Sequence, residues 1–238
     1  MVAIVAGSPS YPETPRSRGI TPFIARVRRG LSSLGLRTPR LFRGPRVETP
    51  LVAPVLQTER LVIRPHRLSD AQAWYAIQSD DGVLRFLSWP HRSRSESLQH
   101  LKDRTRHTTL SQANDFLALA IELDGQLVGD LSLHLRTVHP DFRSAEIGWI
   151  LASSHGGVGL AGEAVCAALD MLFDRLDVKW ISAVVDIRNE RSLALATRLG
   201  FLEVSRDGHY LTMVQSRDQR QPCSAPREKV DPDRSQER

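Results

Sequence analysis

The sequence predicts an α/β fold built on one mixed sheet, in which mostly antiparallel strands come first and a β-α-β unit follows. Two observations support this prediction. Asp124-Gly125 separates two apolar runs and is typical of the tight turn that joins antiparallel strands. Further on, a glycine turn at residues 157–162 lies between an apolar run and a helical run, and another apolar run follows that helix. A helical crossover of this kind joins parallel strands of one sheet.

The first half of the chain is expected to contribute strands on both sides of two helices. A strand is predicted at residues 61–64. Ser69-Asp-Ala-Gln72 and Ser93-Arg-Ser-Glu96 have the spacing of capping boxes, which satisfy free N–H groups at a helix start. They predict one helix that ends near Ser79 and another over residues 98–110. Further strands are expected over residues 116–122, 126–137 and 143–151.

The second half is expected to alternate helix and strand after the glycine turn. Apolar residues recur at helical spacing between residues 161 and 173. A short later helix is predicted to end at Gly200, because glycine is favoured directly after the last helical turn. The remaining expected elements are a strand at 178–187, that helix at 192–199, and strands at 201–204 and 209–214.

Length and charge predict one domain with an extension at each end. Residues 1–53 hold nine Arg and two Glu, and we expect a disordered Arg/Pro-rich extension there, with a targeting segment as the alternative. Residues 54–215 form the expected domain, and residues 216–238 a polar, flexible tail. The domain is mildly acidic, which argues against a nucleic-acid partner. No apolar run reaches the roughly 18 residues of a membrane span.

The two cysteines, Cys166 and Cys223, form neither a disulfide framework nor a metal cluster in the sequence. This usage favours a reducing compartment, and we expect the cytoplasm. Cys166 lies within the helical run and is interpreted as a packing residue.

The glycine turn predicts a site for a phosphate-bearing cofactor, because N–H groups at a helix N-terminus attract anions. A P-loop is excluded, since Glu163 rather than Lys follows Gly162. Gly157-Val-Gly159-Leu-Ala-Gly162 does match the dinucleotide fingerprint, and Asp186 stands near the expected ribose-binding acid. An NAD-dependent enzyme therefore stays open on this motif, although the hairpins before the turn are unlike that fold.

Five segments together resemble the GNAT acetyltransferase superfamily, especially its RimJ/RimL-like branch, over about residues 56–214. They are Thr58-Glu-Arg-Leu-Val-Ile-Arg64, Glu146-Ile-Gly-Trp-Ile-Leu151, Gly157-Val-Gly-Leu-Ala-Gly-Glu-Ala164, Asn189-Glu-Arg-Ser192 and Leu199-Gly-Phe201. One position differs, because Ser154 stands where the family's turn usually begins with Gln or Arg. The resemblance implies a GNAT-like fold whose β-α-β unit binds acyl-CoA.

The resemblance also implies how acetyl-CoA is held. Its pantetheine arm is expected to pair with the backbone of Ile150, Leu151 and Ala152, and to bind the side chain of Asn189. The pyrophosphate is expected on backbone N–H groups of the turn. The turn residues concerned are Gly157, Val158, Gly159, Leu160 and Ala161.

Acetyl transfer to an amine requires a base, since a free alkylamine is mostly protonated at neutral pH. Glu146 is the first candidate, on the strand that leads to the cofactor, and His134 on the preceding strand is the reserve. Ser192 is expected to protonate the departing thiolate. Asn189 and Ser192 have an alternative role as caps of the helix that follows. Direct transfer, without a covalent acyl-enzyme, is the simpler expectation.

The acceptor is expected to be a primary amine, either a protein N-terminus or a small molecule. Trp74, Phe86 and Trp89 lie in the region that walls the acceptor site in similar enzymes, with core packing as the alternative. A non-catalytic acyl-CoA-binding module remains the competing interpretation. The sequence leaves open whether the protein forms a homodimer.

Overall fold

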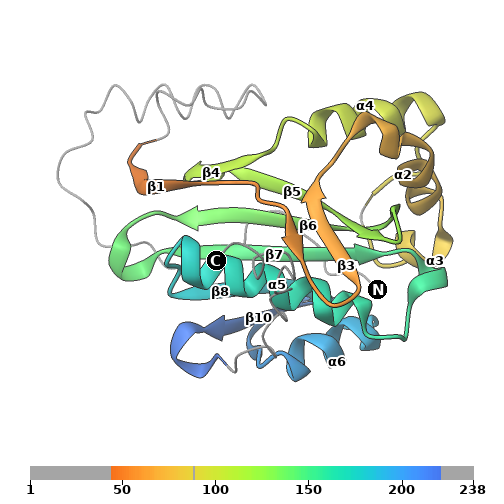
Figure 1. Cartoon of the computed structure of the whole chain (residues 1–238). Coiled ribbons are helices and arrows are strands. Elements are labelled where there is room, and N and C mark those ends of the chain that lie inside the picture. The colour runs from red at the N-terminus through yellow and green to blue at the C-terminus, as the bar shows by residue number, and fades with distance from the viewer. Residues whose placement is uncertain (1–43, 88, 221–238) are drawn as a thin grey trace, which may run out of the picture.

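The computed structural model describes residues 44–220 apart from residue 88 (Figure 1). Its main sheet has eight strands in the order β2-β3-β5-β6-β7-β8-β10-β9, and β1 and β4 form a separate pair. The strands are β1 (Arg46–Val52), β2 (Leu56–Gln57), β3 (Leu61–Pro65), β4 (Thr109–Gln112), β5 (Phe116–Leu123), β6 (Gln126–Thr137), β7 (Ser144–Leu151), β8 (Trp180–Asp186), β9 (Leu202–Asp207) and β10 (Tyr210–Ser216). The α-helices are α2 (Ala71–Gln78), α3 (Asp81–Leu84), α4 (Arg94–Arg104), α5 (Leu160–Arg175) and α6 (Glu190–Arg198).

The predicted mixed sheet is confirmed. Neighbouring strands are antiparallel except β7 and β8, which are parallel and are joined through α5. Asp124 and Gly125 form the predicted hairpin turn between β5 and β6, with φ angles of 48° and 79°. Both turn residues need positive φ in this kind of turn, which is why Asp-Gly favours it.

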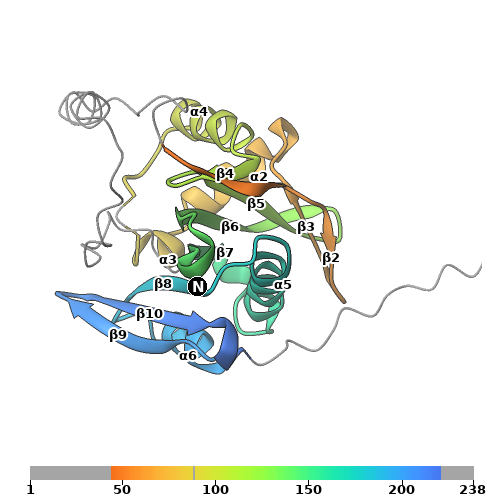
Figure 2. The same cartoon turned by 90° about the vertical axis from the view of Figure 1, so that its left-hand side faces the viewer.

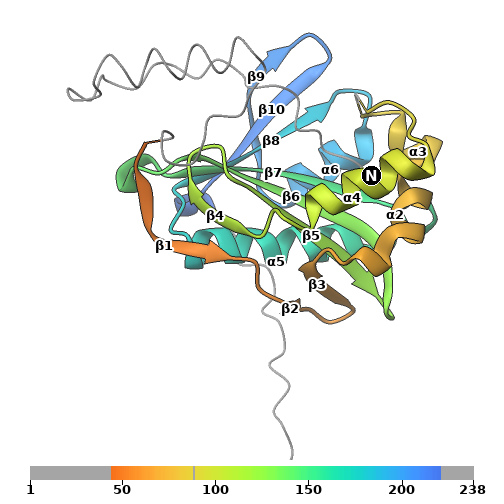
Figure 3. The same cartoon turned by 90° about the horizontal axis from the view of Figure 1, so that it is seen from above.

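The two faces of the sheet pack against different helices. Alternate residues of a strand point to opposite faces. Ile147 and Trp149 of β7 pack with α5 and α6 in the larger core, whereas Ile150 packs with Trp74 of α2 in a smaller one. Helices α2, α3 and α4 gather at one end of the molecule (Figure 1). The β9–β10 hairpin projects from the sheet (Figures 2 and 3).

The two predicted capping boxes have different outcomes. Ser93 and Glu96 form the predicted capping box of α4, with Glu96 N–H donating to Ser93 Oγ at 3.3 Å. The helix ends at Arg104, not at residue 110, because residues 109–112 form β4. The Ser69 capping box is wrong. A 3₁₀ turn at Leu68–Asp70 precedes α2, and the Asp70 carboxylate accepts the Arg67 N–H at 2.7 Å.

The predicted N-terminal extension, residues 1–53, is also wrong in its last part. β1 pairs with β4, and Val47 and Leu51 are buried in the larger core. Arg143 also forms an ion pair with Glu48 of β1, at 2.5 Å. These contacts join β1 to the domain, and the sequence did not mark it as a strand because only Val47 and Leu51 are buried, without the alternation of a typical strand. The rest of the predicted extension, residues 1–43, lies outside the described residues.

The predicted C-terminal tail begins later than residue 216. Arg220 pairs with Asp170 and Asp174 on the exposed side of α5, and its guanidinium lies 5.4 Å from the Phe173 ring centre. Residues 221–238 lie outside the described residues. Cys166 on α5 is disulfide-bonded, which corrects its interpretation as a reduced packing residue. Within residues 44–220, no helix has the length and apolar character that a bilayer crossing requires.

Candidate active site

The parallel strands β7 and β8 separate along their length and so create the centre of the site. They pair only at their first residues, with Ser144, Ala145 and Glu146 opposite Trp180, Ile181 and Ser182. No pairing between the two strands is recorded among the described residues beyond that point. Each strand therefore presents an edge at its carboxyl end that an extended ligand can pair with.

Backbone directions identify which residue of β7 faces this opening. Ala152 donates its N–H to the Val128 carbonyl at 2.9 Å, so its N–H is already used. The Ile150 carbonyl also points to β6, since a Cβ added to Gly129 would lie 2.4 Å from it. Alternate residues of a strand direct their backbone groups to opposite edges. Leu151 alone among the three predicted residues therefore has its N–H directed towards β8.

The glycine turn has the conformation that its sequence predicts. Gly157 and Gly159 both have φ of 87°, a left-handed conformation that glycine adopts without a Cβ clash. Helix α5 starts at Leu160, and the first N–H bonded within the helix is that of Glu163, to the Gly159 carbonyl at 3.1 Å. The N–H groups of the preceding first-turn residues have no partner within the helix, as at any helix start. They make this turn suitable for a phosphate.

Arg60 lies against the same turn, which sequence reasoning missed. Its Nε binds Glu163 Oε2 at 2.7 Å, and its Nη1 binds the Val158 carbonyl at 2.8 Å. Its Nη2 lies 3.3 Å from the position of a Cβ on Gly159. Thr58 also donates to Glu163, at 2.5 Å. In the sequence, Thr58 and Arg60 were noted only as part of the family resemblance. In the structure, their polar side chains bind the first turn of a distant helix.

A second arginine approaches the turn from the other side. Arg191 of α6 places Nη1 3.5 Å from the Cβ position of Gly156. Ser154, which stands in place of the family's Gln or Arg, binds the neighbouring His155 side chain at 2.9 Å. Positive charge near the turn is therefore supplied by Arg60, directly before β3, and by Arg191 of α6.

Glu146 is fully buried where β7 and β8 begin to separate. Arg136 Nη2 binds its Oε2 at 2.7 Å, while its Oε1 is buried without a hydrogen-bond partner among residues 44–220. Burial raises the pKa of Glu146, and Arg136 offsets part of that rise. His134 lies directly opposite Glu146 on β6 and stacks on Phe116 at 4.6 Å. The structure thus brings both candidate bases together.

Asn189 and Ser192 lie at the start of α6, directly after the carboxyl end of β8. Asn189 Oδ1 accepts the Ser192 N–H at 3.2 Å and caps the helix. Both residues are buried. The capping alternative is confirmed for Asn189 but not for Ser192, which only donates its backbone N–H to the cap, and a role of either residue towards a ligand remains a prediction.

The dinucleotide interpretation fails because the acid it requires, Asp186, is already bound within the protein. Asp186 binds Arg188 through both its carboxylate oxygens, at 2.9 and 2.6 Å, and accepts the Arg188 N–H at 2.9 Å. These bonds lower the pKa of Asp186 and occupy the carboxylate that a ribose would need. The antiparallel first half of the sheet is also unlike the doubly wound dinucleotide fold.

The three predicted acceptor-wall residues fall into two kinds. Trp74 is fully buried and belongs to the smaller core. Phe86 and Trp89 are partly buried and pack on that core beside Ala152 at the end of β7. Trp74 is thus a core residue, whereas Phe86 and Trp89 lie where a wall is expected.

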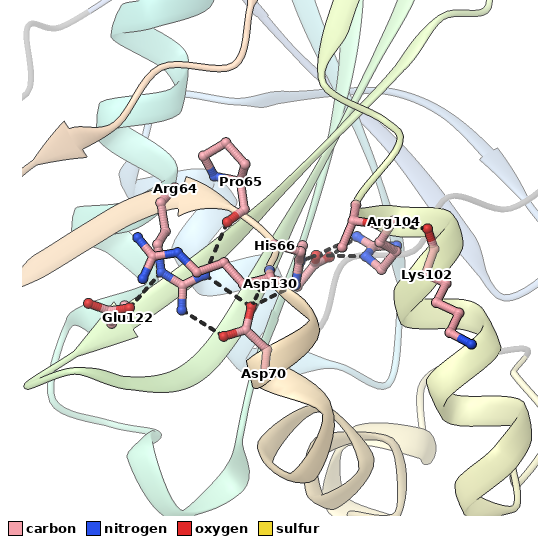
Figure 4. A network of polar contacts seen from close by, with 10 residues as sticks. Arg64, Pro65, His66, Asp70, Lys102, Arg104, Glu122 and Asp130 are labelled. Carbon is pink, nitrogen blue, oxygen red and sulfur yellow. Dashed lines mark hydrogen bonds and ion pairs between the residues drawn. The ribbon is translucent and has the colours of Figure 1, made fainter.

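A buried charge network (Figure 4) lies against Trp74 of the smaller core, which its members Arg104 and His66 contact. Arg104 Nε donates to Asp130 Oδ1 at 3.0 Å, and His66 Nε2 lies 2.8 Å from the same oxygen. Burial opposes the charge on Asp130, but the Arg104 guanidinium and His66 overcome it and lower the pKa of Asp130 to about 2. Arg64 binds Asp70 and Glu122 next to this group. The network fixes β3, α4 and β6 relative to one another, and sequence spacing gave no sign of it.

Comparisons with known proteins agree on one family. The acetyltransferase (GNAT) domain matches residues 60–202. The uncharacterized N-acetyltransferase p20 of Bacillus licheniformis is 30% identical over 147 residues, covering 61% of this chain and 81% of p20. Escherichia coli spermidine N(1)-acetyltransferase is 27% identical over 141 residues, covering 58% of this chain and 71% of that enzyme. Mycobacterium smegmatis RimJ in complex with CoA-disulfide superposes with a TM-score of 0.55 at 27% identity, covering 71% of this chain and 87% of RimJ.

Proposed function

The chain belongs to the GNAT acetyltransferase family and is an acetyl-CoA-dependent N-acetyltransferase, and we propose the residues by which it moves the acetyl group to a primary amine. The observation that carries the proposal is the opening between β7 and β8, with the glycine turn at one end and buried Glu146 at the other. Acetyl-CoA supplies the activated acyl group as a thioester. The acceptor amine attacks it without a covalent acyl-enzyme.

The cofactor contacts follow from the backbone. Among the three predicted residues of the cofactor strand, Leu151 directs its N–H into the opening, and this group suits a carbonyl of the pantetheine arm or thioester. The turn from Gly157 to Ala161 offers helix N-terminal N–H groups for the pyrophosphate. Arg60 adds a cation beside that turn. Asn189 stands after β8, within the same opening, as the proposed partner of the pantetheine amide.

Glu146 is the proposed general base, acting directly or through one water. Its free Oε1 is an acceptor without a partner among the described residues, and its raised pKa brings it closer to the range useful for proton transfer at neutral pH. Arg136 holds the other oxygen and fixes the carboxylate. Ser192, in the first turn of α6 after β8, is the proposed proton donor to the thiolate.

The acceptor is a primary amine, and a protein N-terminus and a small polyamine are the two classes among the relatives. RimL, a ribosomal L7/L12 alpha-N-protein acetyltransferase that shares the fold, is named for the first class, and spermidine acetyltransferase for the second. The partly buried Phe86 and Trp89 would face either acceptor.

The test uses the full chain, acetyl-CoA and a panel of primary amines, with thiol release as the readout. Glu146→Gln is expected to reduce kcat about a hundredfold or more. It should leave the acetyl-CoA-induced rise in the unfolding midpoint intact, because the substitution keeps the shape of the side chain. Glu203→Gln, on the exposed strand β9, is the matched control.

The outcomes separate the alternatives. Full activity of Glu146→Gln would move the base elsewhere, and His134→Gln would be tested next. A protein that binds acetyl-CoA but acetylates no amine in the panel would be the non-catalytic acyl-CoA-binding module. Absence of acetyl-CoA binding would contradict the proposed function itself.

A further inference from the structure

Arg92 is a partly buried cation that forms no ion pair with any of the described residues. Its Nη1 is buried and has no hydrogen-bond partner among residues 44–220. The rest of the guanidinium lies over the Trp89 ring, 5.1 Å from its centre. A desolvated guanidinium without a hydrogen-bonded anion is costly, so such groups are usually paired.

The charged neighbours of Arg92 do not supply that anion. Glu96 is the acid whose charge favours the Arg92 cation from a distance, but it forms no ion pair with Arg92, and its Oε2 binds the Ser93 N–H and hydroxyl, at 2.7 and 2.8 Å. The carboxylate of Asp130 is held by Arg104 and His66. Arg104 is itself a cation that destabilises the charge on Arg92. Among the described residues, therefore, no acid forms a direct ion pair with Arg92.

His100 adds no charge to the surroundings of Arg92. Burial, together with Arg104 and Arg92, lowers its pKa to about 4, so it is neutral at physiological pH. Its ring stacks on Trp74 at 5.7 Å and lies edge-on to Trp89 at 5.4 Å. Arg92 thus stands at the edge of an aromatic wall.

This wall continues to the end of the cofactor strand. Trp89 packs on the smaller core, which includes Ile150 near the end of β7. Ala152, directly after β7, packs on the same core. A group bound at Arg92 would therefore lie on the acceptor side of the opening, away from the glycine turn that follows β7 on the α5 side.

We propose that Arg92, seated on Trp89, is an anion-recognition subsite for the acceptor, so that the preferred substrates are amines that carry a carboxylate or phosphate close to the reacting nitrogen. This inference rests on the proposed function. Guanidinium groups bind both anions through charge-assisted hydrogen bonds. A polyamine is the disfavoured class, because its additional cations would meet Arg92 without a compensating acid.

The experiment compares acceptors that share one amine and differ in charge. Two peptide amides carry aspartate or asparagine directly after the N-terminal residue, ethanolamine is compared with its phosphate ester, and spermidine represents polycations. We expect the wild-type chain to prefer the anionic member of at least one pair by about tenfold or more in kcat/KM. The pair that shows the preference identifies the anion.

Variants assign the preference to Arg92. Arg92→Gln is expected to abolish this preference by lowering kcat/KM for the anionic acceptor only. Arg92→Glu is expected to reverse it and to improve spermidine. Arg94→Gln is the matched control, since Arg94 lies two residues away over the Tyr75 ring, 4.6 Å from its centre. Unfolding midpoints with and without acetyl-CoA show whether each variant is folded. If Arg92→Glu is not folded, the test rests on Arg92→Gln alone.

Three outcomes would overturn the inference. Equal kcat/KM for charged and neutral partners in the wild-type chain would remove the anion preference. A preference that survives Arg92→Gln would assign it to another residue. Weakened acetyl-CoA binding in Arg92→Gln would place the arginine on the cofactor instead. Failure to acetylate any amine, with acetyl-CoA bound, would instead contradict the proposed function on which the inference depends.

Discussion

Glu146 shows how two opposing effects set the behaviour of a single residue. Burial favours the protonated carboxyl and raises its pKa, whereas the Arg136 guanidinium favours the carboxylate and lowers it. Because the general base must be deprotonated, activity is expected to rise as the pH passes upward through the pKa of Glu146.

Arg136→Gln should therefore shift the pH profile. Without the cation, burial acts unopposed and the pKa of Glu146 rises further, so the acid limb of log kcat/KM should move to higher pH. The profile is measured with one acceptor from below pH 5 to above pH 8. Arg206→Gln on β9 is the control, since Arg206 contacts only the exposed Glu203. An acid limb that stays in place would show that Glu146 is not the base.

Arg60 is expected to contribute to cofactor affinity. Its guanidinium lies over the glycine turn and also neutralises Glu163, whose carboxylate would otherwise repel a phosphate. Arg60→Ala should raise the Kd of acetyl-CoA about three- to tenfold and leave kcat at saturation unchanged, because the side chain is half exposed and far from the reacting atoms.

Calorimetric titration measures this Kd, and a second substitution separates the two effects. Glu163→Gln in the Arg60→Ala background should recover part of the affinity, because it removes the unpaired carboxylate. No change in affinity with Arg60→Ala would restrict Arg60 to anchoring β3 on α5.

At the scale of elements, the glycine turn and α5 combine two different uses of glycine. Gly157 and Gly159 are in the left-handed region, whereas Gly162 lies in the first turn of the helix, where a Cβ would meet Leu195 at an ordinary 3.4 Å. Alanine is strained in the first case and favoured in the second.

Alanine substitutions should therefore differ in sign. Gly157→Ala and Gly159→Ala are each expected to lower the free energy of unfolding by about 1–2 kcal/mol. Gly162→Ala should change it by less, or raise it by about 0.5–1 kcal/mol. Urea unfolding measures all three, and equal losses would show that the turn conformation is not what selects glycine here.

At the scale of the whole molecule, β1 is what closes the larger core at the N-terminal side. Leu51 is 6% exposed and its neighbour Val52 is 64% exposed. Leu51→Ala is expected to cost about 2–5 kcal/mol of unfolding free energy, because it leaves a cavity. Val52→Ala should change it by less than about 0.5 kcal/mol. Similar effects for both, in thermal or urea unfolding of the full chain, would contradict the contribution of β1 to the core.

The sequence by itself determined the elements whose signals are local. The hairpin at Asp124-Gly125, the cap at Ser93, the helix end at Gly200 and the glycine turn before α5 are set by backbone conformations that few residue types allow. The β-α-β order and Glu146 followed from the same patterns and from the family resemblance.

Tertiary structure decided the rest, because it brings together residues that are far apart in the chain. Residues 109–112 pair with β1 rather than extending α4, and Arg60 meets Glu163 across about a hundred positions, as Asp130 meets Arg104 and His66. That no acid among the described residues forms an ion pair with Arg92 likewise emerges only when its packed neighbours are known. Local spacing cannot encode such contacts, since burial and charge pairing depend on which segments the fold places side by side.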